Sequence, residues 1–572
     1  MKPLLSLICL FTLAACNQSD SNIKFKYHKD IFIKSAHYFS SAWPKTFWQE
    51  FEEGNVDKEL KQIKADGFNT VVLTVPWRGF ETDFGSKRTE SNEFLYQRLT
   101  FVIESIIDNQ MLFMLRVGFP HDYTQNTGTD IMQQCIGIYS EEGMQAHWQK
   151  YLNKVKKTIQ RYDAASAGIL VSWEDWWCPH FVLPRQTHET RIEMAQKLGY
   201  GNWLKQQNNN IVKVLLQSDD VNFEQVSIPQ PGDLSYVLYL DFIDQLIDQK
   251  ILKPTQTIFP NTALEIRVDK LPVKQGDQYT WIGHNLYLDE KNHRGTYWAP
   301  FWGAQNNGEL LSAEQALKNF EYFLKLVSGE GKNINHVIEQ FNFYDNTPYF
   351  PNNANIKPAE IAQFLISAGP LLKQYAQGVG VWAYKDYLDN GLYNASFEMG
   401  LDGWETSGNV QLKQNTGDQQ LSMAVNSTIT QSVDAEDRFM LVHTYETLDF
   451  CLKSDRQAQL KISINGTAQR TVDLQSGYNC TEITASPFKQ KEPTTLTITA
   501  NDAVTIDELS LHGFTQVLGL YHPDGTEGPY LPAYRQLNNF FSVNHSLCLV
   551  TILSQSLQMC ENIQTLGKGQ TI

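Results

Sequence analysis

Two hydrophobic patterns alternate between residues 30 and 390 of the chain. Short β-branched apolar runs are typical of buried parallel strands, and apolar residues repeated every three or four positions are typical of amphipathic helices. The predicted strands are residues 31–36, 70–75, 112–117, 168–173, 263–268, 279–284, 334–339 and 378–383. Helical patterns lie between most of them, at residues 56–66, 91–108, 142–162, 313–328 and 358–377. Eight strands with helical crossovers predict an α/β fold, a (β/α)8 TIM barrel over residues 30–393.

Two stretches depart from this alternation. Residues 268–279 leave too little chain for a full helix between the fifth and sixth predicted strands, so that corner is irregular or the fifth strand is misplaced. Residues 178–256 are rich in Gln, Asn and Asp. They predict an extended loop region after the fourth strand, with one helix near residues 234–249.

After residue 393 the pattern changes to short alternating strands separated by turn residues, which predicts a β-sandwich over residues 394–513. Its opening, Asn394-Ala-Ser-Phe-Glu-Met-Gly-Leu-Asp-Gly-Trp404, and its close, Thr505-Ile-Asp-Glu-Leu-Ser-Leu511, resemble the ends of jelly-roll carbohydrate-binding modules. The resemblance implies a jelly-roll-like fold. It leaves open whether the sandwich binds sugar or only braces the barrel.

Beyond the sandwich, residues 518–526 and 532–538 resemble the loop and last helix that close many glycosidase barrels. Because the eighth predicted strand lies at 378–383, we expect the sandwich to be inserted before that helix, with residues 514–541 returning to the barrel. Tandem order with a C-terminal appendage is the alternative. The tail, residues 542–572, has no assignment.

The first residues are typical of an export signal. Lys2 is followed by an apolar run at residues 4–13, which is too short to cross a bilayer. Leu13-Ala-Ala-Cys16 resembles the bacterial lipobox, which implies a lipoprotein signal over residues 1–16 and lipidation of Cys16. An ordinary signal with a chance cysteine is the alternative. Asn17, by resemblance to the sorting rule, implies an outer-membrane lipoprotein of the cell envelope, facing either the periplasm or the exterior.

Charge and cysteine content narrow the class of partner and cofactor. A net charge of −16 argues against nucleic acid or an anionic membrane surface, so we expect membrane contact through the lipid anchor alone. Beyond the signal, the even number of cysteines suggests disulfides, paired in sequence order as 135–178, 451–480 and 548–560. The sequence has no HExxH, GxSxG, P-loop or GxGxxG motif, so we expect no catalytic metal and no cofactor.

Two glutamates end predicted strands of the barrel, Glu174 the fourth and Glu339 the seventh. In a (β/α)8 barrel such positions face the open end where chemistry occurs, and an unpaired carboxylate at the end of an apolar strand is costly without a role. Glycoside hydrolysis requires one carboxyl group to protonate the leaving oxygen and a second to attack the anomeric carbon or activate water. The pair therefore favours a glycoside hydrolase.

This placement resembles clan A of the glycoside hydrolases. The resemblance implies a retaining mechanism with Glu174 as acid/base and Glu339 as nucleophile. It also implies substrate contacts from Trp382 at the end of strand eight, and from His284 or Tyr287 near strand six.

The chain departs from the clan A pattern at two places. Trp173 stands where the clan has Asn, and strand two has no Arg, which Arg78 or Arg116 could replace. Asp175, beside Glu174, is a competing acid.

Aromatic residues near the strand ends supply candidate sugar-stacking faces, in keeping with an aromatic content of 12%. These candidates are Trp77, Trp176, Trp177, Trp298, Trp302 and Trp382. His37, His121 and His284 also lie near strand ends and could bind sugar hydroxyls or hold the nucleophile. We therefore expect cleavage of a polysaccharide, such as a bacterial exopolysaccharide or capsule. The alternative is a catalytically inactive, polysaccharide-binding surface lipoprotein.

Overall fold

The computed structural model describes the core of the barrel and the sandwich. The described residues are 26–44, 46–81, 93–117, 131–171, 177–267, 273–275, 278–280, 295–298, 304–329, 331, 335–348, 350–388, 390–415, 418–433, 446–489 and 493–542. Within them, the side chains of 78–79, 131–135, 177, 181, 265–267, 273–275, 278–280 and 295–298 are outside the description.

Eight parallel strands close into a barrel, which confirms the predicted fold class. In order around the barrel they are β1 (Ile33–His37), β12 (Gly378–Val381), β10 (Val337–Gln340), β8 (Gly295–Trp298), β5 (Thr262–Arg267), β4 (Ser166–Val171), β3 (Leu112–Val117) and β2 (Thr70–Val75). The helices predicted between them are α2 (Glu53–Ala65), α4 (Glu93–Asp108), α7 (Glu142–Ile159), α13 (Ala313–Val327) and α14 (Ile361–Tyr375). Their apolar faces pack on the strands in one continuous core.

The sixth strand differs from the prediction at residues 279–284. Residues Gln278–Thr280 form β7, which pairs with β6 (Val273–Gln275) in a two-stranded antiparallel ribbon outside the barrel. The sixth barrel strand is β8, which pairs with β5 and β10. The short run Gly295-Thr-Tyr-Trp298 carries a weaker strand signal than the apolar segment chosen from the sequence, and only its place between two neighbours makes it a barrel strand.

Residues 178–256 were predicted as an extended loop region with one helix near residues 234–249. Helix α11 (Tyr236–Ile247) confirms that helix, and the loop prediction for the rest of the segment is wrong because further helices form there. The structure forms η2 (Trp177–Val182), η3 (Leu183–Arg185), α8 (His188–Leu198), α9 (Tyr200–Leu204), α10 (Asn209–Leu216), α11 (Tyr236–Ile247), η4 (Asp248–Leu252) and α12 (Lys253–Ile258). Thr187 and Asn208 cap the starts of α8 and α10 through their side chains, and Gly199 ends α8 in the left-handed conformation. These caps stabilise short helices in a polar segment.

The sandwich consists of two five-stranded antiparallel sheets. One has the order β14 (Glu405–Ser407), β17 (Thr428–Val433), β22 (Thr494–Ala500), β19 (Ala458–Ile464), β20 (Thr467–Leu474). The other has the order β15 (Val410–Asn415), β16 (Asp418–Met423), β23 (Val504–His512), β18 (Thr447–Ser454), β21 (Gly477–Thr484). Alternate residues of both sheets form a separate apolar core.

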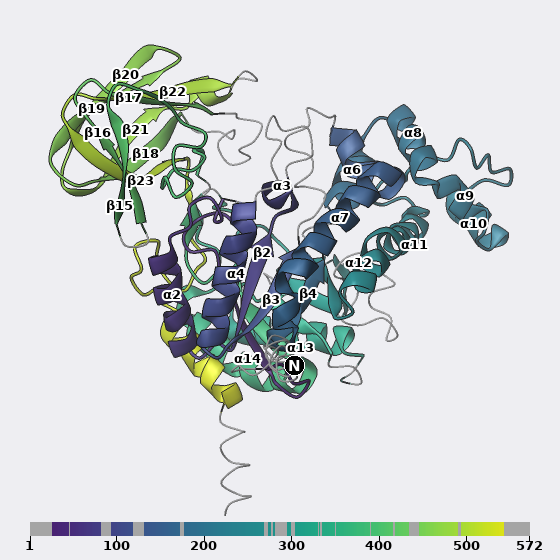
Figure 1. Cartoon of the computed structure of the whole chain (residues 1–572). Helices are drawn as coiled ribbons and strands as arrows, with labels where there is room; N and C mark the ends of the chain where they lie inside the picture. Colours follow the sequence, from purple (N-terminus) through teal and green to yellow (C-terminus); the bar gives the residue numbers. More distant parts are fainter. Residues whose placement is uncertain are drawn as a thin grey trace, which may run out of the picture.

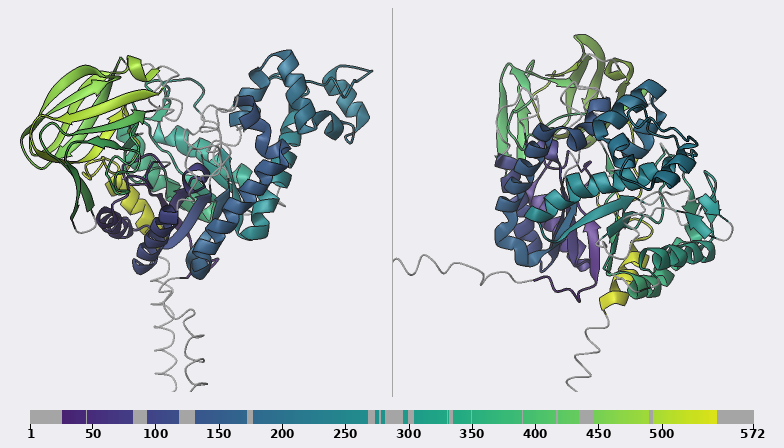
Figure 2. Two further views of the ribbon diagram at one scale, coloured as in Figure 1. Left: turned by 45° about the horizontal axis from the view of Figure 1, so that its top comes forward. Right: turned by 90° about the vertical axis from the view of Figure 1, so that its right-hand side faces the viewer.

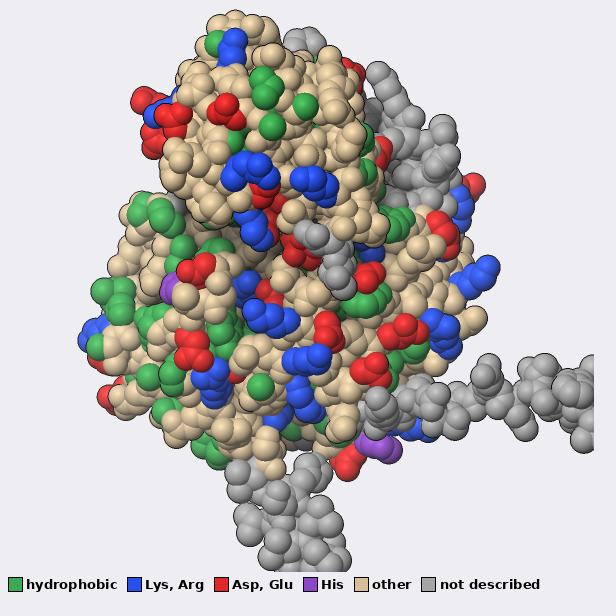
Figure 3. Space-filling model, turned by 60° about the vertical axis from the view of Figure 1, so that its left-hand side comes forward, with side chains coloured by type: hydrophobic (Ala, Val, Ile, Leu, Met, Phe, Trp, Pro, Cys, Tyr) green, Lys and Arg blue, Asp and Glu red, His purple; other side chains and the backbone are tan. Residues whose placement is uncertain are grey.

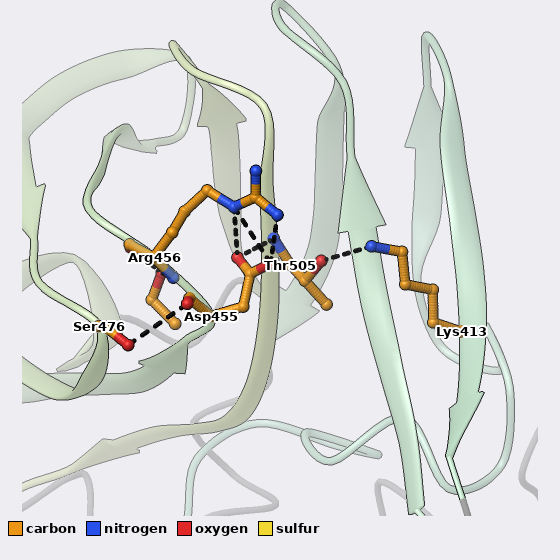
Figure 4. Close-up of polar contacts among 6 residues, drawn as sticks. Lys413, Asp455, Arg456, Ser476 and Thr505 are labelled. Carbon is orange, nitrogen blue, oxygen red and sulfur yellow. Dashed lines mark hydrogen bonds and ion pairs between the residues drawn. The ribbon is translucent and has the colours of Figure 1, made fainter.

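A disulfide and several polar contacts stabilise the sheet that contains β18 and β23. Cys451 and Cys480, directly opposite on β18 and β21, form a disulfide, as predicted. Cys178 is also disulfide-bonded, and the side chain of Cys135, its expected partner, lies outside the description. Figure 4 shows how Asp455, just after β18, accepts hydrogen bonds from Arg456 and from the Thr505 amide at 2.9 Å.

The chain returns to the barrel after the sandwich. β13 (Tyr387–Leu388) before it pairs with β24 (Thr515–Gln516) after it. Residues 531–542 are helical and pack on the barrel through stacked rings, Phe541 on Phe32 and Tyr534 on Phe68. The sandwich strands thus lie in sequence between the eighth barrel strand and this helix.

The sandwich and the α8–α10 segment stand on opposite sides of the same end of the barrel (Figures 1 and 2). α3 (Trp77–Phe80), which directly follows β2, lies between them in Figure 1. This end is therefore the one where the strands have their carboxyl ends. No helix among the described residues is long and apolar enough to be a membrane-span candidate.

An acidic seam, defined as Glu52, Glu398, Asp418, Asp507 and Glu508, lies where the sandwich meets the barrel. Glu52 precedes α2 of the barrel and the other four belong to the sandwich region, and electrostatic interactions link Glu52 to Glu398, Asp418 and Glu508. Figure 3 shows acidic and basic side chains gathered at this junction. Two cations lie close by: Lys453 pairs with Glu508 at 2.8 Å, and Arg98 of α4 donates to the Glu398 carbonyl at 3.3 Å.

Burial raises the pKa of several seam carboxyl groups. Burial, reinforced by Glu508, raises the pKa of Glu52 to about 7. Burial also raises the pKa of Glu398 to about 7, against the hydrogen bond from the Gln419 amide. Burial, with Asp418 beside it, raises the pKa of Asp507 to about 9. Protons are thus bound more tightly in the folded seam than in the unfolded chain.

Asp507→Asn is expected to stabilise the protein increasingly as pH rises. Because the folded-state pKa lies above the unfolded value of about 3.9, the stability of the wild type falls as pH rises from the unfolded pKa through about 9. The Asn oxygen can still accept the Glu508 amide, which Asp507 Oδ1 accepts at 2.8 Å. The gain in unfolding free energy at roughly pH 8 is on the order of a few kcal/mol. It is measured as the difference in Tm between variant and wild type at about pH 5 and pH 8.

Asp455→Asn in the same sandwich is the matched control. Burial raises the pKa of Asp455, but hydrogen bonds from Arg456 and the Thr505 amide outweigh it and leave the pKa lowered. Asp455→Asn should therefore destabilise at neutral pH. Parallel Tm curves for Asp507→Asn and wild type across this pH range would show that the seam does not bind protons on folding.

Candidate active site

Strand alternation places a charged layer inside the barrel. Ile33, Val72, Met114, Leu170 and Val337 form an apolar cluster in the barrel interior. Because side chains on a strand alternate between faces, the residue two positions further along each strand also points inward. These residues include Ser35, Thr74, Arg116 and Glu339, all of them buried. Arg116 and Glu339 therefore meet inside the barrel, one layer nearer the carboxyl ends of the strands.

Glu339 is held by two partners. Its Oε1 forms an ion pair with Arg116 Nη2, and both side chains are fully buried. Its Oε2 lies 3.2 Å from Nε2 of His37, the last residue of β1. The same nitrogen lies 3.1 Å from the Glu339 carbonyl oxygen. Each carboxylate oxygen thus has its own nitrogen partner.

His37 is a neutral imidazole in this environment. Burial lowers the pKa of His37 well below its ordinary value, and the positive charge of Arg116 lowers it further. Among the interior side chains that the structure describes, Arg116 and Glu339 supply one cation and one anion, which balance.

Trp382, just after β12, closes one side of the Glu339 site. Its ring meets the His37 ring edge-on, with centroids 4.9 Å apart, and the Arg116 guanidinium lies 5.7 Å from the Trp382 ring centroid. The indole N–H donates to the Tyr387 hydroxyl at 3.1 Å, which fixes the ring plane. The Trp is 6% exposed.

Gly380 of β12 leaves the space that the Glu339 backbone requires. A Cβ at this position would lie 2.1 Å from Ser35 Oγ and 2.6 Å from the Glu339 carbonyl oxygen. Gly380→Ala is therefore expected to destabilise the barrel by about 1–3 kcal/mol and to displace Glu339. Differential scanning calorimetry measures the loss, with Gly54→Ala in the first turn of α2 as the comparison, since nothing lies within 4 Å of a Cβ at that position. An unchanged melting profile for Gly380→Ala would contradict this packing.

The structure brings together three of the residues predicted for the site: Glu339, Arg116 and Trp382. Of the two arginines considered as replacements for a strand-two Arg, Arg116 pairs with Glu339, and the side chain of Arg78 lies outside the description. His37, one of the histidines noted near strand ends, joins them. Ser35, Gly380 and Tyr387 were not predicted from the sequence. Ser35 could have been found, because it lies two positions after the inward-facing Ile33 on the same strand.

Trp77 does not belong to a sugar-binding surface. It is fully buried, 5.1 Å edge-on from Trp148 and 6.1 Å from Tyr151, both on α7. The prediction that its ring stacks on substrate is therefore wrong, because apolar packing under α7 takes up the indole.

Other predicted site residues belong to segments outside the description. Glu174, His121, Asp175, Trp176, His284, Tyr287 and Trp302 lie outside the described residues, as does Cys16. Only the backbone of Trp177 and Trp298 is described, in η2 and β8. Within the part of the chain that the structure describes, no group of three or more His, Cys, Asp or Glu side chains could hold a metal ion.

The arrangement keeps a carboxylate ionised and oriented inside the barrel. Arg116 supplies the balancing charge, and a neutral His37 adds a hydrogen bond without a second charge. Such a carboxylate can act as a nucleophile toward a carbon centre, or as a buried structural anion.

The solved structures named below are distant likenesses of this chain. No protein-family model matches the sequence, and no match was found among curated proteins. The exo-β-1,4-mannosidase from Opitutaceae bacterium strain TAV5 is 13% identical over 65% of this chain and 56% of its own, with a TM-score of 0.34. The endo-1,4-β-mannanase from Rhizomucor miehei is 10% identical over 62% of this chain and 86% of its own, with a TM-score of 0.37. Endo-glycoceramidase II from Rhodococcus sp. is 10% identical over 83% of this chain and 99% of its own, with a TM-score of 0.33.

These three neighbours are glycoside hydrolases by name, and the chain spans about half the length of the mannosidase. At such identities and TM-scores the likeness carries no argument about activity. The barrel assignment rests on the parallel strand pairing of this chain itself.

Proposed function

We propose that this protein is a retaining glycoside hydrolase that cleaves a polysaccharide, with Glu339 as nucleophile and Glu174 as acid/base. The observation that carries the proposal is the Glu339 carboxylate, held at the end of β10 by Arg116 and His37 beside the Trp382 ring. An ionised, oriented carboxylate next to an aromatic face is the arrangement that attack on a sugar ring requires. A bacterial exopolysaccharide, a capsule or another glycan is the proposed substrate class.

In the first chemical step, a Glu339 oxygen forms a bond to the anomeric carbon while the glycosidic C–O bond breaks. Glu174 gives its proton to the departing oxygen. In the second step water attacks the same carbon, Glu174 takes the proton of the water, and the bond to Glu339 breaks, which restores both carboxyl groups. Arg116 balances the charge of Glu339 before attack and after release.

A second candidate function is polysaccharide binding without cleavage. The observation that favours it is the complete burial of Glu339 in an ion pair with Arg116, since a structural carboxylate would have the same environment. A retaining enzyme requires about 5–5.5 Å between its two carboxyl groups, and an inverting enzyme about 6.5–9.5 Å. A binding protein requires neither separation.

Reducing-sugar release from a panel of bacterial and plant polysaccharides distinguishes the two functions. Wild type is compared with Glu174→Gln, Glu339→Gln and a control, Glu321→Gln, whose carboxylate pairs with Lys325 on the surface of α13. Wild type and Glu321→Gln are expected to hydrolyse polysaccharide, and Glu174→Gln and Glu339→Gln are expected not to. Circular dichroism should show that all four proteins are folded. Hydrolysis by both site variants would overturn the site assignment, and binding without hydrolysis by wild type would establish the second function.

We further propose that the protein is anchored to the outer membrane through a lipid on Cys16 and contacts the membrane by that anchor alone. The support is the Leu13-Ala-Ala-Cys16 motif and the net charge of −16. Cys16→Ser is expected to abolish incorporation of labelled palmitate and to release the protein from membranes. Membrane retention by the variant would contradict the anchor.

A further inference from the structure

The hydrogen bonds of His37 fix its tautomer. Nε2 of His37 faces two oxygens of Glu339, the main-chain carbonyl at 3.1 Å and carboxylate Oε2 at 3.2 Å. A carbonyl oxygen accepts hydrogen bonds and never donates them, so Nε2 must carry the proton. Because the imidazole is neutral, Nδ1 then has a lone pair and is an acceptor.

Charge balance favours the neutral form of the His37 imidazole. Arg116 and Glu339 already form a balanced pair with no exposed surface, and His37 is 1% exposed. A proton on Nδ1 would place a second cation beside Arg116, with Glu339 as the one anion among the described side chains that contact the imidazole, which is costly. The facing charged groups are Arg116 from β3 and Glu339 from β10, and the Trp382 ring covers one edge of the imidazole.

Nδ1 of His37 is a buried acceptor with no hydrogen-bond partner among the residues that the structure describes. Buried polar atoms are nearly always paired, so Nδ1 calls for a donor that the described residues do not supply, a water molecule in the free protein or a hydroxyl group of a bound ligand. A sugar presents hydroxyl groups around its ring. Trp382, 4.9 Å from the His37 ring, is the aromatic face proposed to receive that ring.

We propose that His37 is a two-sided residue of the site: its Nε2–H positions Glu339 for attack, and its Nδ1 accepts a hydrogen bond from a hydroxyl group of the bound sugar. The inference rests on the proposed function, because it takes Glu339 as the nucleophile. It makes His37 a positioning residue through one nitrogen and a residue that determines substrate specificity through the other.

Two substitutions separate these roles. His37→Gln retains an N–H at the distance of Nε2 from the backbone and has no atom in the place of Nδ1. His37→Asn places an amide oxygen near the position of Nδ1 and is too short to reach Oε2 of Glu339. His37→Leu, which offers neither group, is the control.

The expected kinetic effects differ between the variants. A hydrogen bond to a charged group corresponds to a factor of about 10 to 150. His37→Gln should keep kcat within about threefold and raise KM about tenfold, while His37→Asn should lower kcat by about 10 to 100-fold at similar KM. His37→Leu should show both losses. A purely structural role would instead affect all three in proportion to their melting temperatures.

A measurement without substrate tests the tautomer separately. In the full-length protein with ¹⁵N-labelled histidine, the imidazole signals of His37, assigned by their loss in His37→Gln, should show neutral, Nε2-protonated imidazole from about pH 5.5 to 8. A charged ring or an Nδ1–H tautomer would overturn the inference whatever the activity.

The kinetic outcomes distinguish this inference from the proposed function. An active wild type in which the Gln and Asn variants behave alike would overturn the roles of His37 and leave the proposed function standing. A wild type without hydrolytic activity on any polysaccharide of the panel would overturn the proposed function, and the inference with it.

Discussion

Glu339→Ala is expected to lower kcat by at least about a thousandfold, because it removes the carboxylate that the proposed mechanism uses as the nucleophile. It also leaves the Arg116 guanidinium without its anion, next to a cavity the size of a carboxylate. A small anion such as azide should enter this cavity, attack the anomeric carbon and restore turnover. The product should be a glycosyl azide of the configuration opposite to that of the substrate.

The configuration of the azide product assigns the two roles. Azide added to Glu174→Ala should instead give a glycosyl azide of retained configuration, because azide replaces the acid/base-assisted water in the second step. Glu339→Gln serves as a control that fills the cavity, and azide should not rescue it. Rescue of Glu339→Ala to a product of retained configuration would show that Glu339 is not the nucleophile. The products are identified by NMR.

Arg116→Met is expected to destabilise the barrel by about 3–5 kcal/mol, the largest stability effect we predict. The substitution leaves the Glu339 carboxylate buried with only the hydrogen bond from a neutral His37. For a barrel of this size the loss corresponds to a fall in Tm of roughly 4–6 °C. Scanning calorimetry measures it on the barrel transition.

A second substitution distinguishes charge from packing in this result. Replacing both members of a buried pair by apolar residues is close to neutral, so Arg116→Met combined with Glu339→Leu should recover most of the lost stability. The surface pair of Arg161 with Glu104, 2.9 Å apart and about half exposed, provides the comparison, and Arg161→Met should change Tm little. If the double variant is no more stable than Arg116→Met, the loss comes from packing and not from an unpaired charge.

The sequence predicted most barrel strands because their signal is local. Strands β2 and β3 were predicted to the residue, since unbroken apolar runs such as Thr-Val-Val-Leu-Thr-Val are recognisable without neighbours. β8 could not be predicted, because its pairing partners are distant in sequence and its own residues carry little strand signal. Within residues 178–256 the sequence indicated only the helix near 234–249. α8 was missed because its apolar stripe is weak, and α10 because it has only eight residues, although it is amphipathic. Side-chain caps at Thr187 and Asn208 mark the starts of these two helices.

The candidate site was predictable in part. Glu339 and Arg116 both follow an inward-facing apolar residue by two positions, so strand alternation alone indicates that they point into the barrel. That they pair with each other depends on how the barrel closes. Trp77 follows a strand end just as Trp382 does, yet packing under α7 buries it beside Trp148, which no local pattern reveals.

Covalent labelling of the nucleophile is the measurement with which to begin. Wild type is incubated with a panel of activated 2-deoxy-2-fluoro glycosides, which slow the second chemical step so that the sugar stays attached, and is then digested and examined by mass spectrometry. The sugar is expected on the peptide that contains Glu339, and no label is expected on Glu339→Gln. A stable label on another carboxylate, or hydrolysis of polysaccharide with the label appearing equally on Glu339→Gln, would contradict Glu339 as the nucleophile.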